Sequence, residues 1–276
     1  MSAAAENLDA YAQIEALNWS SLKHLATSAK LLHYRSEAPR PDTKALRVGR
    51  AVHCAVFEPA RWRSEYVAQP DFGDLRTKKA KAAREEWREQ LVEGVEVISA
   101  DEHALAMRLA KAVREHPDAA KILRSGRAEE VVTWTDPETG VECKGRFDWI
   151  TPRFICDLKS TRQSNLRGMR ADFARFLYHG QLAWYHDGAI AAKLIPADAE
   201  QPRAIVVQTV EPFDVVPFFL LTSDLERGRA LYRSLLHRYV ECQSAEWWPG
   251  LAPSLTPLDL PPWAAGGDDE TDEEDW

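Results

Sequence analysis

The sequence predicts an α/β (α+β) fold in which helices flank a mixed central sheet. Apolar residues recur at helical spacing through much of the first 117 residues, whereas β-prone runs bounded by turn residues fill the middle of the chain. One helical stretch, two β-prone runs and a last helical stretch then follow in that order. The 276 residues suffice for one large domain or two small ones with a substantial core.

The N-terminal part is expected to be helical. Ser20 or Ser21 is a candidate N-cap for a helix that continues to about Tyr34. A second helix is predicted over Thr43–Phe57, where the apolar residues fall on or near one face. A third helix begins after the N-cap Ser99 and continues to about residue 116.

A charged segment separates the second and third of these helices. Residues 76–93 are rich in Lys, Arg, Ala and Glu and poor in apolar side chains. This composition predicts an exposed helix or a partly mobile insertion, placed near 74–93. A short strand is expected directly after it, over Val95–Ile98.

Three strands are predicted in the middle of the chain. The first covers Val131–Trp134, and the turn signal Asp136–Gly140 separates it from a second strand over Val141–Ile150. The third strand follows at Arg153–Leu158. Together they are expected to form a three-stranded meander.

Helix and strand alternate in the last third of the chain. A long helix is predicted over Met169–Ala192, followed by strands over Ala204–Val210 and Phe213–Val216. Pro217 is expected to stop the second of these strands. A last helix is expected over Ser223–Cys242, with Ser223 as its N-cap.

The composition changes again at the C-terminal end. Pro249–Trp263 is rich in Pro and Leu and is expected to pack as extended chain. Residues 1–263 are therefore interpreted as a single domain, and residues 264–276 as a disordered acidic tail. The tail contains seven acids in the last nine residues, so without it the rest of the chain is near neutral despite a net charge of −8. The net charge therefore does not exclude binding to DNA.

The composition argues against several classes of protein. The four cysteines form no C-x-x-C pair, which argues against a zinc finger and against an iron–sulfur cluster. No Walker motif G-x-x-x-x-G-K-[ST] occurs, so any activity is expected to be independent of ATP. No run of about 18 apolar residues and no signal-peptide pattern occurs, which predicts a cytoplasmic protein without a membrane span.

Two carboxylates and a lysine fall at the predicted ends of two neighbouring strands. Asp148 ends the second strand of the meander, and Asp157 and Lys159, at i and i+2, project together from the end of the third. Two carboxylates this close repel unless a cation lies between them, and oxygen ligands of this kind suit Mg²⁺ or Mn²⁺. Such a metal can polarise a phosphodiester and activate water, while the lysine holds that water or stabilises transition-state charge.

The triplet alone is a weak signal. Asp and Lys are common surface residues and D-x-K occurs by chance in most proteins, so a solvated strand end is the simpler interpretation. The surroundings favour a site, because Asp157 stands between the apolar run Phe154–Cys156 and Leu158. An unpaired charge in a buried strand is costly, which hints at a metal.

Further motifs occur in an order that resembles a known family. They are Gly49-x-x-x-His53, Glu129 or Glu130, Lys144-Gly145-Arg146-Phe147-Asp148, Asp157-Leu158-Lys159-Ser160-Thr161 and Gln181-x-x-x-Tyr185. The sequence resembles the RecE-like exonucleases of phages and prophages in the PD-(D/E)XK superfamily, with lambda exonuclease and the RecB nuclease domain as more distant relatives. The resemblance extends over about residues 10 to 263 and implies a PD-(D/E)XK, restriction-endonuclease-like core.

The resemblance implies a role for each motif position. His53, Asp148, Asp157 and the backbone carbonyl of Leu158 would bind the metal. Lys159 would act on the water or on the scissile phosphate, and the catalytic set would also include both aspartates and one acid of the first strand.

Two neighbouring glutamates compete for that last position. Glu129 fits the spacing of the family, but Glu130 is adjacent, and only one of them can face the site because neighbours in a strand point oppositely. Gln181 and Tyr185, at i and i+4 on one helical face, resemble the motif that contacts the DNA backbone and supports the site. The same supporting role is assigned to Thr161 and Arg162.

Other basic residues are weaker candidates for phosphate contacts, since most surface Lys and Arg are merely solvated. They are Arg35, Lys44, Arg47, Lys78, Lys79 and Arg167. Phosphate contacts of this kind would make DNA binding sensitive to salt.

By resemblance, the protein is expected to be a Mg²⁺-dependent exodeoxyribonuclease that degrades double-stranded DNA from its ends. Digestion would run 5′ to 3′ and leave 3′ single strands for recombination. The implied partners are double-stranded DNA ends, a single-strand annealing protein and further copies of the chain in a homo-oligomeric ring. The alternatives are an endonuclease or flap nuclease on the same site, and a catalytically idle DNA-binding protein on a nuclease fold.

Overall fold

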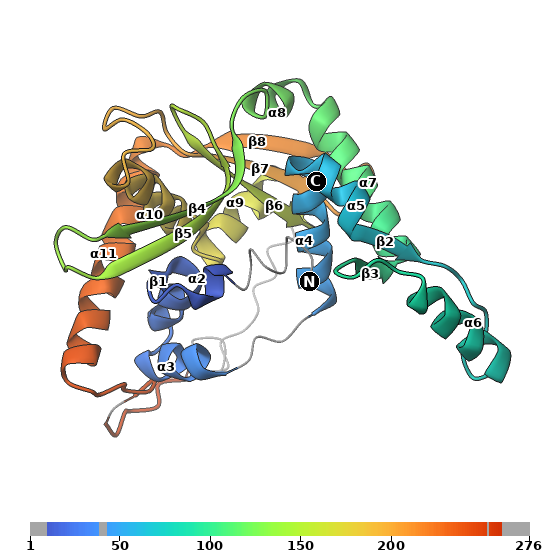
Figure 1. Ribbon diagram of the computed structural model, residues 1–276. Coiled ribbons are helices and arrows are strands. Elements are labelled where there is room, and N and C mark those ends of the chain that lie inside the picture. The colour runs from blue at the N-terminus through green and yellow to red at the C-terminus, as the bar shows by residue number, and fades with distance from the viewer. Residues whose placement is uncertain (1–9, 39–42, 253, 261–276) are drawn as a thin grey trace, which may run out of the picture.

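A six-stranded mixed sheet lies at the centre of the structure, a computed structural model that describes residues 10–38, 43–252 and 254–260 (Figure 1). Its strands are β1 (Leu17–Asn18), β4 (Arg127–Thr135), β5 (Glu142–Ile150), β6 (Ile155–Thr161), β7 (Arg203–Gln208) and β8 (Val215–Phe219). The order is β1-β5-β6-β7-β8, and β4 pairs with β5 off this path. The β1–β5 and β6–β7 pairs are parallel and the others antiparallel, so the predicted mixed sheet is confirmed.

The predicted meander is confirmed as β4-β5-β6, but β6 is longer than expected. It continues to Thr161 because it pairs from Cys156 onward with the parallel strand β7. Asp157 and Lys159 therefore lie inside a strand rather than at its end, and Asp148 lies two residues before the end of β5. The expectation that all three end their strands is wrong.

The sheet forks at the middle of β5. β5 and β6 pair only through the last two residues of β5 and the first two of β6, and then diverge. Because β4 pairs along the whole other edge of β5, β1 must occupy the same edge as β6, where it pairs with Cys143 and Lys144. Gly145–Asp148 lies between these two short ladders, so the fork leaves room for side chains to converge at Asp148.

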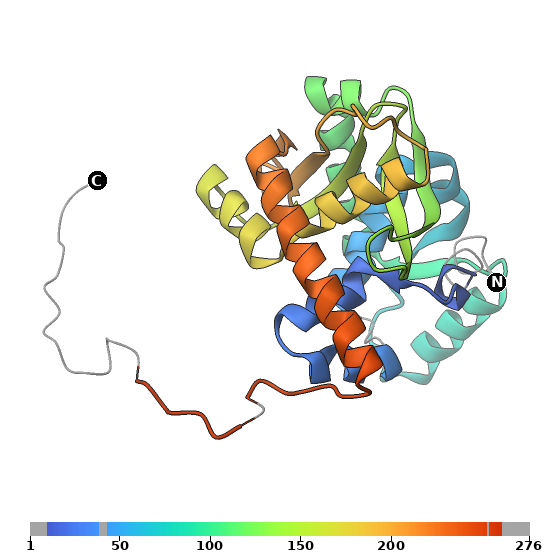
Figure 2. The ribbon, with the colours of Figure 1, turned by 90° about the vertical axis from the view of Figure 1, so that its left-hand side faces the viewer.

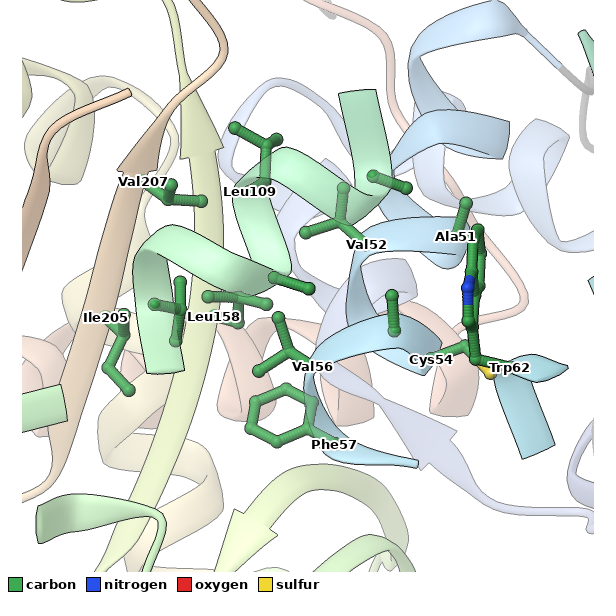
Figure 3. Close-up of a cluster of buried hydrophobic side chains, with 14 of the residues drawn as sticks. Ala51, Val52, Cys54, Val56, Phe57, Trp62, Leu109, Leu158, Ile205 and Val207 are labelled. Atoms are coloured by element: carbon green, nitrogen blue, oxygen red, sulfur yellow. The ribbon is translucent and has the colours of Figure 1, made fainter. Parts of the chain in front are cut away.

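One face of the sheet is covered by α4 (Lys44–Phe57) and α7 (Ala100–Glu115). Val52 and Val56 of α4 and Leu109 of α7 are buried against the sheet (Figure 3). The sheet contributes Cys156, Leu158, Ile205 and Val207 to this core. Alternate residues of β6 thus pack under α4, which places the helix beside the fork.

Both of these helices were predicted, and their N-caps hold them in place. Thr43 accepts a hydrogen bond from Leu46 N, and Ser99 forms a capping box with Glu102. The sequence analysis missed two short helices that begin with a proline, α5 (Pro59–Glu65) and α8 (Pro117–Ile122). In both, proline begins the helix instead of ending the preceding one, because the first helical position needs no N–H donor.

The other face is covered by α10 (Tyr178–Ala191) and α11 (Thr222–Ser244), which pack side by side (Figure 2). α9 (Leu166–Arg175) precedes α10, so the continuous helix predicted over Met169–Ala192 is wrong. Leu177, between the two helices, has a left-handed backbone with φ 58°, which a right-handed helix cannot continue through.

The N-terminal helix is likewise divided, into α2 (Trp19–Leu22), the 3₁₀ turn η1 (Lys23–Ala26) and α3 (Ala29–Glu37). The caps are Asn18, which accepts a hydrogen bond from Ser21 N, and Ser28, which accepts one from Leu31 N. The predicted caps Ser20 and Ser21 are wrong because Asn18, two positions before Ser20, already provides the acceptor.

Three predictions near the C-terminus are also corrected. Pro217 lies inside β8, where it is tolerated because β8 is an edge strand. α11 begins at Thr222 after Leu221 without a side-chain cap, so Ser223 is not its N-cap. After α11 the chain packs through Trp248 and Pro249, but the extended part that follows does not, since Leu255 and its neighbouring leucines are exposed (Figure 2). The predicted disordered tail at 264–276 lies outside the described residues.

The charged segment forms a projecting arm, which we define as residues 66–99. The strands β2 (Tyr66–Gln69) and β3 (Glu96–Ser99) pair in parallel at its base, and α6 (Lys78–Glu89) lies at its far end (Figure 1). The expected exposed helix and the short strand after it are confirmed. No helix in the described part of the chain is long and apolar enough to cross a membrane.

Two glycines offer a matched test of helix packing. A Cβ on Gly228 of α11 would overlap the carbonyl oxygen of His179 on α10, whereas a Cβ on Gly49 of α4 would meet nothing within 4 Å. We expect Gly228→Ala to destabilise the protein by about 1–3 kcal/mol through overpacking, and Gly49→Ala to stabilise it by up to about 1 kcal/mol through helix propensity. Urea unfolding of both variants measures the difference, and a Gly228→Ala variant as stable as wild type would contradict the close approach of α10 and α11.

Candidate active site

Three side chains from three elements converge at the fork of the sheet. His53 comes from α4, Glu129 from β4 and Asp148 from β5. His53 Nδ1 lies 3.4 Å from Asp148 Oδ1 and 4.0 Å from Glu129 Oε1. One nitrogen or oxygen atom from each residue lies within 4.8 Å of the others, a spacing that fits a single metal ion.

The backbone of Leu158 is tied to this cluster on both sides. Its N–H donates to Asp148 Oδ2 at 2.8 Å, where a continued β5–β6 ladder would offer a carbonyl instead. Its carbonyl accepts a hydrogen bond from His53 Nε2 at 3.1 Å. His53 Nδ1 therefore faces the two acids. The hydrogen bond from Nε2 also occupies one lone pair of the Leu158 carbonyl oxygen, which the resemblance predicts to be a metal ligand.

Glu129 rather than Glu130 lies in the cluster. It falls opposite Asp148 in the β4–β5 register, and its backbone is left-handed with φ 53°, an uncommon conformation that often marks a functional site. Arg146 Nε lies 2.9 Å from Glu129 Oε2 and fixes the carboxylate. Glu130 instead pairs with Arg127 at 3.2 Å.

A second group, centred on Asp157, adjoins the first. Lys159 Nζ lies 2.6 Å from Asp157 Oδ2, and Gln181 Nε2 donates to Asp157 Oδ1 at 3.1 Å. The ring of Tyr178 lies under the lysine, 4.6 Å from Nζ to the ring centroid, which is a cation–π contact. Tyr178 was missed by the sequence analysis, since only the helix break at Leu177 places it here.

The remaining predicted residues lie around this group or away from it. Tyr185 packs against Phe147, with ring centroids 5.0 Å apart, and so supports the site from beneath. Thr161 donates a hydrogen bond to Asp172 of α9 at 3.3 Å, and Arg162 is exposed. The structure therefore brings neither Thr161 nor Arg162 into the cluster.

The charges in the cluster shift one another strongly. Burial alone would lower the pKa of His53, but Asp148 and Glu129 outweigh it and raise that pKa to about 9. Burial likewise opposes ionisation of Asp148, yet His53, Lys159 and the Leu158 N–H hold the pKa of Asp148 below its usual value. Without a metal, the imidazolium is thus the cation that neutralises this carboxylate.

The other two acids are less completely neutralised. Burial raises the pKa of Asp157 to about 6, with Lys159 opposing the shift and Asp148 adding to it. Burial and Asp148 together raise the pKa of Glu129, against the effect of Arg146 and His53. The three acids of the site thus face three cationic partners, and one of these positive charges is lost when His53 gives up its proton.

The residues present fit a divalent metal ion. Glu129 Oε2 and Asp157 Oδ2 are buried and make no hydrogen bond within the described residues, although each has a cationic side chain nearby. Carboxylate oxygens with an imidazole nitrogen suit a hard or borderline divalent cation. His53, Glu129 and Asp148 are the three residues spaced to hold it.

A forked mixed sheet with paired acids and a lysine inside the fork defines the nuclease class called PD-(D/E)XK. The chain belongs to the family described as "PDDEXK-like domain of unknown function (DUF3799)", whose profile matches residues 18–255. Nucleases of this class typically use divalent metal ions, and this agrees with the triad found here.

A solved structure supports the same fold. The crystal structure of a candidate exonuclease from Eubacterium rectale matches with a TM-score of 0.55 at 14% identity, over 84% of this chain and 82% of that protein. No curated protein sequence gives a significant match. The predicted membership of the PD-(D/E)XK superfamily is thus confirmed, and the fold class with it.

Proposed function

We propose that the protein is a Mg²⁺-dependent exodeoxyribonuclease that digests double-stranded DNA from its ends without ATP. The single observation that carries the proposal is the fork of the sheet, where a metal-binding triad adjoins the Asp157–Lys159 pair. Exonuclease activity is favoured over the endonuclease alternative because the matched structure is described as a candidate exonuclease. The 5′ to 3′ direction, the annealing partner and the ring are proposed from the resemblance to RecE-like enzymes.

His53, Glu129 and Asp148 would hold the metal ion, which when bound supplies a Lewis acid for the phosphate and lowers the pKa of a coordinated water. The protein's own side chains hold the charged groups of the site in fixed positions. Lys159, held between Asp157 and the ring of Tyr178, presents an ammonium group beside the acids, where it can donate to a phosphate oxygen. Gln181 fixes Asp157 and so keeps the lysine in place.

Digestion of end-labelled linear duplex DNA tests the activity. With Mg²⁺ and without ATP, we expect loss of nucleotides from one strand, starting at its end, and no loss with EDTA. Covalently closed circular duplex of the same sequence should stay intact. Separate 5′ and 3′ labels report the direction, and removal of the 3′ label first would reject the proposed polarity.

Two outcomes would favour the other functions. Cutting of the closed circle, or release of a flap from a branched duplex, would favour an endonuclease or flap nuclease on the same site. A protein that binds DNA but cleaves none of these substrates with Mg²⁺ or Mn²⁺ would favour a catalytically idle DNA-binding protein.

A further inference from the structure

The projecting arm is anchored beside the candidate active site. Arg50 of α4 makes an ion pair of 3.1 Å with Glu96 of β3, at the base of the arm. Arg50 stands three residues before His53, so the anchor lies one helical turn from a candidate metal ligand. From this base the arm extends away from the sheet and ends in α6 (Figure 1).

One ridge of α6 is basic. Lys81, Arg84 and Arg88 are spaced i, i+3 and i+7, so they follow one line along the helix. The ridge borders the packed side of the arm, where Ala80 is buried and Trp87 contacts Phe72. We call Lys81, Arg84 and Arg88 the basic ridge.

The basic ridge is not neutralised by the rest of the molecule. In the part of the chain that the structure describes, none of its three side chains forms an ion pair, although surface arginines elsewhere commonly do. Arg84 Nε is buried without any hydrogen-bond partner among these residues. No acceptor among the described residues therefore fixes this side chain.

The acidic residues of α6 stay off the line of the basic ridge. Glu85 borders the ridge, and Glu86 and Glu89 lie further around the helix, on the flank that also carries Lys78 and Lys79. Helix-stabilising pairs of Lys81 with Glu85 at i and i+4 are available but are not formed, so the ridge remains open. Basic side chains without an ion pair in the described part of the chain are free to meet the charges of an anionic partner.

We propose that the basic ridge binds the phosphate backbone of duplex DNA at a distance from the scissile bond. From Lys81 to Arg88 the basic ridge spans about 10 Å along α6, which corresponds to about three base pairs of duplex. A ridge anchored beside α4 and extended over this length holds the duplex without contacting the reacting phosphate. The proposal rests on the proposed function only in taking DNA as the partner.

Equilibrium binding tests the ridge separately from cleavage. Fluorescence anisotropy with a labelled 30-base-pair duplex in EDTA compares the wild-type chain with Lys81→Gln/Arg84→Gln/Arg88→Gln. We expect the triple variant to bind roughly tenfold or more weakly, and the slope of log affinity against log salt to fall by about 2 to 3, one counterion for each lost phosphate contact.

The matched control is Glu85→Gln/Glu86→Gln/Glu89→Gln, which removes three charges from the same helix, off the line of the basic ridge. Glutamine is a good helix former, so both triple variants should keep α6, and circular dichroism checks this. The control is expected to bind DNA no more weakly than wild type. An equal loss in both triple variants would overturn the proposal, because it would show a change in the helix rather than loss of a contact.

Cleavage of the same duplex is measured in parallel, so that the two proposals can fail independently. An unchanged salt slope in the basic-ridge variant overturns the DNA contact, even if the protein is an active exonuclease. A reduced slope supports the contact, even if no cleavage is seen. Wild-type protein that does not bind duplex DNA at all overturns the contact as well.

Discussion

Lys159→Ala is expected to lower the rate of DNA cleavage by about a thousandfold while leaving metal affinity unchanged or slightly higher. The lysine ammonium lies 2.6 Å from Asp157 and is nearly buried, with its side chain 18% exposed. It is therefore a fixed positive charge, of the kind that stabilises developing negative charge without reorganisation. Because it is not among the residues that could hold the ion, its loss should affect the reaction and not the metal site.

The matched control is Lys121→Ala, which removes a lysine paired with Asp118 on the surface of α8. Its cleavage rate should stay within a factor of about two of wild type, since exposed ion pairs contribute little. Single-turnover cleavage and Mn²⁺ titration on each variant separate reaction from binding. A Lys159→Ala variant that cleaves within about tenfold of wild type would show that the lysine is only a structural partner of Asp157.

The central sheet and its meander could be predicted because local signals agreed with the final structure. Two β-prone runs flank the turn residues Asp136–Gly140, a pattern that favours a hairpin. The turn is formed, and Asp136 accepts hydrogen bonds from Thr139. Asp148, Asp157 and Lys159 could be selected because charges set into an apolar strand need a partner. The structure provides such a partner for each of them.

The features that could not be predicted depend on contacts between segments that are far apart in the sequence. The fork exists because β6 leaves β5 for the parallel strand β7, and nothing near Asp157 in the sequence signals that change of partner. Tyr178 reaches Lys159 only because Leu177 breaks the helix, although leucine itself favours helix. Glu129 rather than Glu130 lies in the cluster, and its backbone there is left-handed. The alternation of side chains along a regular strand cannot predict such a backbone.

The triad whose spacing fits one ion does not coincide with the predicted ligand set, which stays a prediction. Asp157 was predicted to bind the metal directly, but its two oxygens face Lys159 and Gln181. Glu129, which was expected to be a catalytic acid, takes its place beside His53 and Asp148. Without an ion, each acid has its own cationic partner: Lys159 pairs with Asp157, His53 with Asp148 and Arg146 with Glu129.

The protonation of His53 has a consequence for both stability and metal binding. Burial works against the charged imidazole, but Asp148 and Glu129 overcome it and raise the pKa of His53 to about 9. A raised pKa in the folded state means that the stabilisation is fully present below the ordinary value of about 6.5 and is lost as the pH rises through about 9. The metal-free protein should therefore unfold at a lower temperature at about pH 9 than at about pH 7.

Metal affinity should change in the opposite direction. An imidazole must lose its proton before Nδ1 can bind an ion, so the metal competes with a proton at every pH below about 9. We expect the affinity for Mn²⁺ to rise about tenfold for each pH unit between about 6.5 and 8, with close to one proton released per ion. Calorimetric titration in buffers of different ionisation enthalpy counts that proton directly.

The variant His53→Asn isolates the effect, because asparagine keeps a polar side chain on α4 but has no proton to lose in this range. Its affinity for Mn²⁺ should be lower than that of wild type at about pH 8 and nearly independent of pH, since Asp157 with a pKa of about 6 is already mostly ionised above that value. His33→Asn is the control, because His33 stacks on Trp248 away from the cluster and should leave the slope intact. A wild-type affinity that does not vary with pH would mean that no proton on His53 competes with the metal, so that His53 either carries no proton in this range or does not bind the ion.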